Sequence, residues 1–231
     1  MIQVFDLKKA YNGMLALNVP SITIPQGQSF GLVGNNGAGK TTFFRLLLDL
    51  TESSNGHVEI DGQTVARNDA WKSSVGSFID DGFLLDFLTP EEYFAFVGKL
   101  YGKTPPDIAA FCDSMTDFFN GEILSKRKFI RDFSQGNRKK IGIAAALLGA
   151  PKILILDEPF TALDPSSQIR IKRLLADLQK QQNITMLISS HDLNHISEVC
   201  SRIVVLEHGV IVRDIMTGAD TLRELENYFA V

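Results

Sequence analysis

The chain has 231 residues, of which 45% are hydrophobic and 22% charged, a globular composition that argues against disorder. Its formal net charge of −4 gives no overall basic surface for DNA or RNA, and two cysteines, Cys112 and Cys200, are too few for a disulfide framework. The best candidate for a membrane span, residues 141–156, is broken by Pro151 and Lys152 before it reaches the roughly 20 apolar residues that a spanning helix needs. We therefore expect a soluble cytoplasmic protein that binds no nucleic acid.

The N-terminal part of the chain is predicted to consist of short strands. Residues 22–24 form one, and residues 29–33 form another that leads directly into a glycine-rich loop. Residues 57–62 read as a strand that ends in an Asp-Gly turn. From about residue 68 to residue 150 the pattern changes to longer helical segments. One of these begins at Pro90, which the first turn of a helix accepts, and apolar residues follow at helical spacing.

Strand patterns return in the last third of the chain. Residues 153–156 and 185–189 are continuous apolar runs, typical of strands buried on both faces of a parallel sheet. The amphipathic stretch 166–181 between them completes a β-α-β unit. Residues 203–215 are predicted to form a hairpin that turns at His208-Gly209. The chain is therefore interpreted as one α/β domain with a mostly helical insertion.

A phosphate-binding loop is the strongest motif. Residues 34–41 match G-x-x-x-x-G-K-[ST] after an apolar strand and before a helix, flanks that a chance glycine-rich turn would not explain. Glycines let backbone N–H groups converge on phosphate oxygens at the helix N-terminus. Lys40 adds a full charge to the β- and γ-phosphates, and Thr41 offers a hydroxyl to Mg²⁺. The expected nucleotide-binding residues of this loop are Gly34, Asn35, Asn36, Gly37, Ala38, Gly39, Lys40, Thr41 and Thr42.

Two carboxylates follow the apolar run 153–156, at the strand end where α/β proteins form ligand sites. Asp157 is the expected carboxylate for Mg²⁺, and Glu158 is placed to take a proton from the water that attacks the γ-phosphate. Read alone, the pair is equally compatible with a solvated exit from a strand. His191 follows the next strand, where an imidazole would bind the γ-phosphate and hold the water and Glu158. A lone histidine is otherwise more often structural.

This set of motifs resembles that of the ATP-binding cassette (ABC) ATPases, in the same order and over nearly the whole chain. Residues 133–137, Phe-Ser-Gln-Gly-Asn, resemble the family signature Leu-Ser-Gly-Gly-Gln. Residues 161–164, which end in Asp164, resemble the D-loop, and His191 resembles the switch histidine. Tyr11 is similar to the aromatic residue that stacks on adenine, although it also suits a core or surface position.

The resemblance implies a fold of the α/β class, a P-loop ABC ATPase core with a mostly parallel sheet, an antiparallel β subdomain and a helical subdomain. Residues 1–231 would form a single ABC ATPase domain. Residues 1–69 and 151–231 would make the nucleotide-binding core with its β subdomain, and about 70–150 the helical subdomain that carries the signature. The implied cofactors are ATP and Mg²⁺. The implied catalytic residues are Glu158, His191 and Lys40.

Two departures from the family pattern concern the metal and the signature. Where the family usually has a glutamine near Mg²⁺ and the water, this chain has Asp80, with Asp81 as the less favoured alternative. The implied metal ligands are Thr41, Asp157 and Asp80. In the signature, Gln135 replaces a glycine and Asn137 replaces the glutamine. The residues implied to meet the ATP of a partner chain are Ser134, Gln135, Gly136 and Asn137.

Ser134 also has an interpretation from helix physics alone. Serine is a good N-cap, so Ser134 is expected to open a helix through residues 141–148 and to create a second anion-binding terminus. An ordinary capped helix is the plain alternative. Because Ser134 lies far along the chain from the loop at 34–41, we expect a two-fold dimer in which each ATP lies between the loop of one chain and Ser134 of the other.

The resemblance implies an ATP-binding and ATP-hydrolysing subunit that powers transport by a separate integral membrane permease. It would be peripheral on the inner face of the cell membrane, as a homodimer or paired with a sister ATPase subunit. Residues 82–102 are most similar to exporter-type subunits and are expected to form part of the groove for the permease. For most of their aromatic residues, core packing of the helical region is the favoured interpretation and groove lining the alternative. Two other functions stay open: a soluble ABC-type ATPase acting on nucleic acid or ribosomes, and a weak regulatory nucleotide binder.

Overall fold

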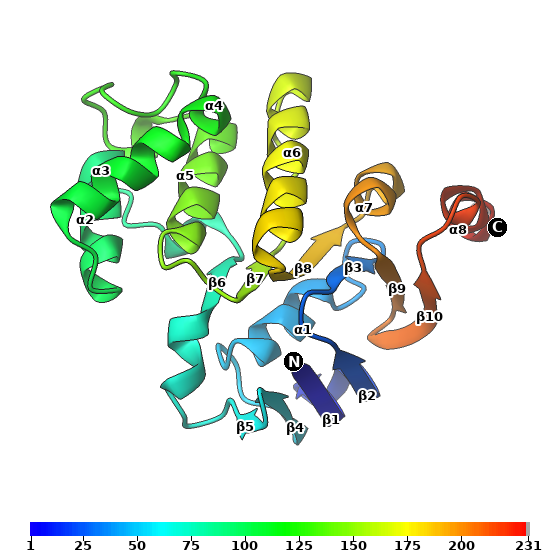
Figure 1. Cartoon of the computed structure of the whole chain (residues 1–231). Coiled ribbons are helices and arrows are strands. Elements are labelled where there is room, and N and C mark those ends of the chain that lie inside the picture. Colours follow the sequence, from blue (N-terminus) through cyan, green and yellow to red (C-terminus); the bar gives the residue numbers. More distant parts are fainter. Residues whose placement is uncertain (230–231) are drawn as a thin grey trace.

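The computed structural model describes residues 1–229, which form a mixed ten-stranded sheet with helices on both faces (Figure 1). The strands are β1 (Ile2–Tyr11), β2 (Met14–Ile24), β3 (Ser29–Val33), β4 (Asn55–Ile60), β5 (Gln63–Thr64), β6 (Val75–Phe78), β7 (Ile153–Leu156), β8 (Thr185–Ser190), β9 (Arg202–Glu207) and β10 (Val210–Met216). The helices are α1 (Lys40–Leu47), α2 (Pro90–Leu100), α3 (Pro105–Ser114), α4 (Thr116–Phe119), α5 (Gln135–Leu147), α6 (Pro165–Gln182), α7 (Leu193–Val199) and α8 (Thr221–Phe229), with 3₁₀ turns η1 (Ala70–Ser74), η2 (Asp81–Phe83) and η3 (Ile130–Asp132).

The sheet has a parallel part and an antiparallel part. Its strand order is β5-β4-β1-β2-β10-β9-β3-β8-β7-β6. Neighbouring strands from β9 to β6 are parallel, whereas β5, β4, β1 and β2 pair antiparallel, as do β9 and β10. A single parallel residue pair between β10 and β2 joins the two parts. The expected α/β fold with an antiparallel β region is confirmed, in a sheet that is mixed along its length.

The parallel strands are buried on both faces because their sequences are continuously apolar. On β7, Leu154 and Leu156 pack into a core with residues of α5, α6 and α7. The alternate residues Ile153 and Ile155 pack into a second core with α1. This alternation follows the two-residue period of a strand. Because β3, β7 and β8 run in parallel, their carboxyl ends meet at one edge of the sheet.

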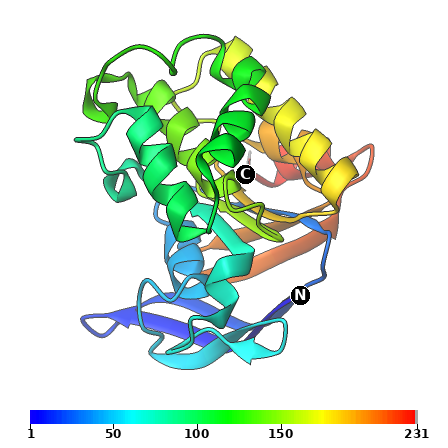
Figure 2. The ribbon, with the colours of Figure 1, turned by 60° about the vertical axis from the view of Figure 1, so that its left-hand side comes forward.

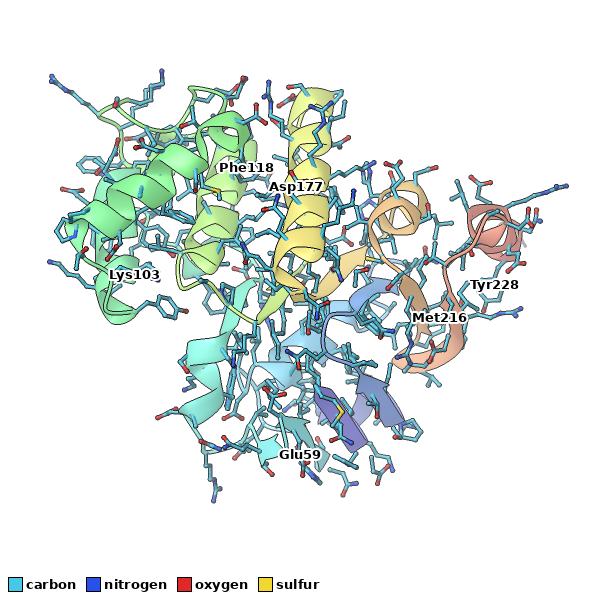
Figure 3. All side chains as sticks on the ribbon, in the orientation of Figure 1. Glu59, Lys103, Phe118, Asp177, Met216 and Tyr228 are labelled. Carbon is cyan, nitrogen blue, oxygen red and sulfur yellow. The ribbon has the colours of Figure 1, made fainter. Side chains whose placement is uncertain are left out.

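Helices α2 to α5 form a group beside β6, and Figure 2 shows this group on the opposite side of the molecule from β1 and β4. Its centre contains buried aromatic residues, among them Phe94 and Phe118, the second of which is labelled in Figure 3. Helix α5 can pack closely on β6 only because position 142 is glycine. A Cβ at Gly142 would lie 2.1 Å from the ring of Phe78.

The predicted elements of the last third are confirmed. The strands at 153–156 and 185–189 are β7 and β8, the amphipathic stretch is α6, and the hairpin of β9 and β10 turns at His208-Gly209. Helix α2 begins at Pro90 with a capping box between Thr89 and Glu92.

The stretch from 68 to 150 is mostly helical, as expected, but it also contains a strand that was not predicted. Residues 75–78 form β6, the edge strand that pairs with β7. The sequence Val-Gly-Ser-Phe is too short to show a strand period, and pairing with β7 decides its conformation. Within residues 1–229, no helix combines the length and the apolar character needed to cross a lipid bilayer.

Candidate active site

The loop between β3 and α1 is shaped by glycine. Gly37 and Gly39 have φ angles of 84° and 107°, in the left-handed region where a side chain is strained. A Cβ at Gly34 would lie 2.3 Å from the carbonyl oxygen of Leu206, so β9 leaves no room for a side chain there. Ala38 N donates to Asn35 O at 3.1 Å and closes the turn. The loop therefore ends at the N-terminus of α1 with its N–H groups close together, which suits an anion.

Lys40 is the first residue of α1 and is only 5% exposed. Its ammonium donates to Gly34 O at 2.6 Å and lies 3.3 Å from Glu158 Oε1. A buried ammonium needs such partners because its desolvation is costly. The side chain thus curls back over the loop and places a positive charge between the loop and the end of β7.

Asp157 directly follows β7 and accepts two hydroxyl hydrogen bonds. Thr41 Oγ1 donates to Asp157 Oδ2, and Ser189 Oγ donates to Asp157 Oδ1. Burial raises the pKa of Asp157, and these two hydroxyl donors oppose that rise. Ser189 was not predicted as a site residue. The feature that could have indicated Ser189 is its position, since it is a polar residue next to the end of the apolar strand β8.

Glu158 lies between a lysine and a histidine. Its Oε1 lies 3.3 Å from Lys40 Nζ, and its Oε2 lies 2.9 Å from His191 Nδ1. Glu158 N donates to Ser189 Oγ at 2.9 Å, and the residue has a left-handed φ of 49°. Among the described residues, Glu158 Oε1 is buried and accepts no hydrogen bond. The Lys40 ammonium is therefore the neighbour of Oε1, and Oε1 would become available to another molecule once Lys40 takes a different partner.

A pocket of about 380 Å³ adjoins these groups. Residues 36–42 of the loop and Glu158 form one side of it, and Leu15, Ala16 and His208 complete the lining. The sequence did not single out these last three residues for a site. They come from β2 and from the turn between β9 and β10. These segments lie near the loop because β10 and β9 stand between β2 and β3 in the sheet.

Tyr11 lies at the end of β1 and is not among the residues that line this pocket. It is 45% exposed, and Lys9 Nζ lies 5.0 Å from the centroid of its ring. Gly34 and Asn35 likewise do not line the pocket, although they belong to the loop.

The side chain of Asp80 pairs with residues outside the expected metal-ligand set. Its Oδ1 accepts from Gly82 N at 2.8 Å, and its Oδ2 lies 3.3 Å from Arg45 Nη2 on α1. The neighbouring Asp81 pairs with Arg138 of α5 at 3.3 Å. Within residues 1–229, both hydrogen bonds of the Asp80 side chain thus run to groups other than the expected metal ligands.

The signature residues lie at the N-terminus of α5. Ser134 is its N-cap and accepts from Asn137 N at 3.2 Å, as helix physics predicts. Ser134 and Gln135 are exposed, and no signature residue lines the pocket at the loop. A Cβ at Gly136 would lie 2.7 Å from Ala162 O, so this glycine allows close contact with the segment after β7.

Asp164, the last residue of the D-loop-like segment, is the N-cap of α6. It accepts from Ser167 N at 3.0 Å and from the hydroxyls of Ser166 and Ser167. These hydrogen bonds hold the pKa of Asp164 well below its ordinary value, and the one from Ser166 has the largest effect. Within one chain, the Asp164 side chain therefore caps the N-terminus of α6.

Comparison with known proteins identifies the family. The family model described as ABC transporter matches residues 17–161. The ABC transporter ATP-binding protein sll0415 of Synechocystis is 30% identical over 223 residues, which cover 92% of this chain and 62% of that relative. The lantibiotic transport ATP-binding protein SrtF of Streptococcus pyogenes is 30% identical over 228 residues, which cover 98% of this chain and 96% of SrtF. A solved ATP-binding subunit of an ABC transporter has a TM-score of 0.83 at 27% identity, and the match covers 98% of this chain and 93% of that one.

The chain therefore belongs to the ABC transporter family. Within this family it is an ATP-binding subunit, an ATPase of the transporter type. The alternative of an ABC-type ATPase that acts on nucleic acid or ribosomes is not favoured, because these relatives are named as transporter subunits. The chain spans less than two thirds of the length of sll0415 and nearly the whole length of SrtF.

Proposed function

We propose that this chain hydrolyses magnesium-bound ATP in the pocket at the 34–41 loop and passes the resulting motion to a separate membrane permease. The observation that carries this proposal is the position of Glu158. Its carboxylate lies between Lys40 and His191, with Oε1 buried and free of hydrogen bonds among the described residues. A carboxylate held in this way is suited to accept a proton from the attacking water.

The β- and γ-phosphates would lie on the backbone N–H groups of the loop and the N-terminus of α1. Phosphate oxygens would then compete with Glu158 for the ammonium of Lys40, which now lies 3.3 Å from Glu158 Oε1. Transfer of this contact to the phosphates would leave the Glu158 carboxylate available as a base. His191 would bind the γ-phosphate with its other ring nitrogen and keep Glu158 oriented through Nδ1.

Magnesium fits the oxygen donors beside the loop. The Thr41 hydroxyl and the Asp157 carboxylate are in direct contact, and oxygen ligands of this kind are those that Mg²⁺ prefers. Bound there, the ion would offset the charge of the phosphates. Asp80 would join them only after its contact with Arg45 opens. Tyr11 does not line the pocket, but it pairs with Met14 next to the lining residues Leu15 and Ala16, and from there it would stack on adenine.

ATP is proposed to bind between two subunits. Ser134 to Asn137 form an exposed helix terminus that can accept an anion, yet they lie outside the pocket of their own chain. A second copy, or a sister ATPase subunit, would bring its own Ser134 and Gly136 to the γ-phosphate. Loss of that phosphate on hydrolysis removes charge-assisted hydrogen bonds across the interface, so the subunits separate.

The proposed docking site for the permease is a groove between β6 and the helical group. It has a volume of about 230 Å³ and is lined mainly by apolar and aromatic side chains, including Phe83, Tyr93 and Tyr101. Phe83 is 53% exposed and Leu100 on α2 is 70% exposed, so apolar surface also lies around it. The proposal places the chain on the cytoplasmic face of the membrane, with an exporter-type permease.

Copurification tests this function. A tagged chain purified from detergent-solubilised membranes should bring down a multi-span membrane protein, and the complex should release phosphate from ATP only when Mg²⁺ is present. Phe83→Asp should lose the membrane protein but keep ATP binding, because position 83 lies in the groove and not in the nucleotide pocket. Copurification of ribosomes or nucleic acid without a membrane protein would contradict the proposal.

A further inference from the structure

Lys139 of α5 is a buried lysine that touches the segment carrying the proposed base. It is 7% exposed, although it follows the exposed N-cap Ser134 by only five positions. Its ammonium donates to Glu158 O at 2.6 Å and to Thr161 Oγ1 at 2.5 Å. Burial lowers the pKa of Lys139, while nearby acidic residues oppose the change. In the sequence, nothing separates this lysine from the basic residues on either side of it, Arg138 and Lys140.

The segment that Lys139 contacts is conformationally unusual. Glu158 has a left-handed φ of 49° and Ala162 one of 60°, a region that L-residues seldom occupy without support. Thr161 Oγ1 donates to Glu158 O at 2.9 Å, so the hydroxyl and the ammonium meet at the same carbonyl. Gly136 of α5 packs against Ala162 O. The first turns of α5 thus hold the turn from Glu158 to Ala162 at both of its ends.

The placement of Lys139 also links two sites. Helix α5 begins with the residues proposed to meet the ATP of the partner subunit, and Lys139 lies one to two turns further along the same helix. Its ammonium then reaches the main chain of the residue proposed to act on the ATP of its own subunit. A shift of α5 when its N-terminus meets a phosphate would therefore be transmitted to Glu158 through one side chain.

We propose that Lys139 is a positioning residue for hydrolysis, which fixes the Glu158–Thr161 turn to α5 and so keeps the Glu158 carboxylate directed at the attacking water. This inference rests on the proposed function, because it assumes that Glu158 is the base. Lys139 itself lines neither the nucleotide pocket nor the groove for the permease. Its effect should therefore fall on the rate of hydrolysis and not on ATP binding.

The adjacent Lys140 provides a matched control. It is more deeply buried, at 1% exposure, and its ammonium pairs with Glu122 at 3.0 Å inside the helical group. Both lysines lie on the same helix and both are buried, but only Lys139 reaches Glu158. A role in stability alone would give the two substitutions the same pattern of effects.

The test uses the full chain, in complex with its permease where that is obtained, and compares Lys139→Met, Lys139→Gln, Lys139→Arg and Lys140→Met. The measurements are thermal unfolding, the Kd for ATP, and kcat and KM for ATP hydrolysis per folded molecule. We expect Lys139→Met to lower kcat at least about tenfold with an unchanged Kd, since small misplacement of a catalytic group is costly in rate. Lys139→Gln and Lys139→Arg keep donors and should recover part of kcat. Lys140→Met should lower stability and leave kcat per folded molecule unchanged.

Three results would overturn this inference. The first is a wild-type kcat in Lys139→Met. The second is a fall in kcat and ATP affinity together, in proportion to lost stability. The third is an equal loss of kcat in Lys140→Met. If Lys139→Met does not fold, Lys139→Gln is measured in its place against the same outcomes. Failure of the proposed function is distinguishable from all of these, because the wild-type chain would then show no magnesium-dependent hydrolysis.

Discussion

Glu158 contacts three residues that are all distant from it in the sequence. Lys40 comes from α1 and His191 from the end of β8, while Ser189 accepts from its main-chain N–H. These groups meet because β3, β7 and β8 are parallel and end at one edge of the sheet. Each oxygen of the Glu158 carboxylate thus has a nitrogen-bearing partner, Lys40 or His191, and these contacts orient the group.

The substitution Glu158→Gln tests the role of this carboxylate. An amide cannot take a proton from water, so kcat should fall by at least about 100-fold, while ATP binding persists. Phosphate release and equilibrium ATP binding, measured on the same preparation, separate the two effects. Hydrolysis at the wild-type rate would show that Glu158 is not the base.

Asp80 calls for a separate prediction, because its carboxylate pairs with Arg45 and accepts from Gly82 N. Asp80→Gln breaks the ion pair but leaves an amide oxygen, so kcat with Mg²⁺ should stay the same or rise. Asp81→Asn, beside it and paired with Arg138, serves as the comparison. An inactive Asp80→Gln chain with normal ATP affinity would instead give Asp80 an indispensable role of its own.

The sequence predicted the residues that follow a recognisable strand or loop and missed those brought in from elsewhere. Lys40, Asp157, Glu158 and His191 were expected to act together, and the structure places them in one contact network in which Ser189 joins Asp157 to Glu158. His208 and Lys139 were not singled out, because a turn residue and one lysine among three basic residues carry no motif. Their positions depend on how β10 and α5 pack, which is tertiary information.

Among the elements, α6 shows how one residue supports the start of a helix. Asp164 caps its N-terminus and receives three hydrogen bonds from Ser166 and Ser167. Asp164→Ala should lower the free energy of unfolding by about 1 kcal/mol, the usual value of an N-cap. Asp164→Asn keeps an acceptor oxygen and should lose less.

The pH dependence of this cap has a definite sign. The pKa of Asp164 is lower in the folded chain than its ordinary value of 3.8. Its charge therefore stabilises the fold fully above that value, and the contribution is lost as the pH falls through the folded pKa. Urea unfolding of wild type and Asp164→Asn should give a difference that is constant near neutrality and shrinks below about pH 4. A difference that grows in acid would contradict the cap.

Elements with strong periodicity were predictable, and short ones were not. The 18 residues of α6 show a clear amphipathic pattern, and the apolar runs of β7 and β8 are typical of buried parallel strands. Strand β6 has four residues, two of them glycine and serine, and its conformation depends on pairing with β7. The sequence therefore indicated the order of the elements better than it indicated where the helical region begins.

At the scale of the whole molecule, the proposed pairing of subunits follows from a separation within one chain. The exposed N-terminus of α5 lies outside the pocket that contains Lys40. A composite site made by two copies predicts that two inactive variants can complement each other. Lys40→Ala removes the ammonium that binds the phosphates in one copy, and Ser134→Arg blocks the N-terminus of α5 in the other.

An equal mixture of these two variants should regain about one quarter of the wild-type hydrolysis rate, since half of the dimers are mixed and each has one intact site. Each variant alone should be inactive while retaining a folded structure by circular dichroism. If the folded variants exchange subunits and the mixture stays inactive, ATP is not shared between two copies of this chain.

The central claim is that the loop at 34–41 grips the phosphates of ATP through its N–H groups and the ammonium of Lys40. Equilibrium binding of ATP, measured by titration calorimetry with Mg²⁺ present, tests it most directly, on the wild-type chain and on Lys40→Ala. The account predicts saturable binding by the wild type and loss of binding by the variant. A wild-type chain with no affinity for adenine nucleotides, or a Lys40→Ala chain that binds ATP as tightly as the wild type, would contradict it.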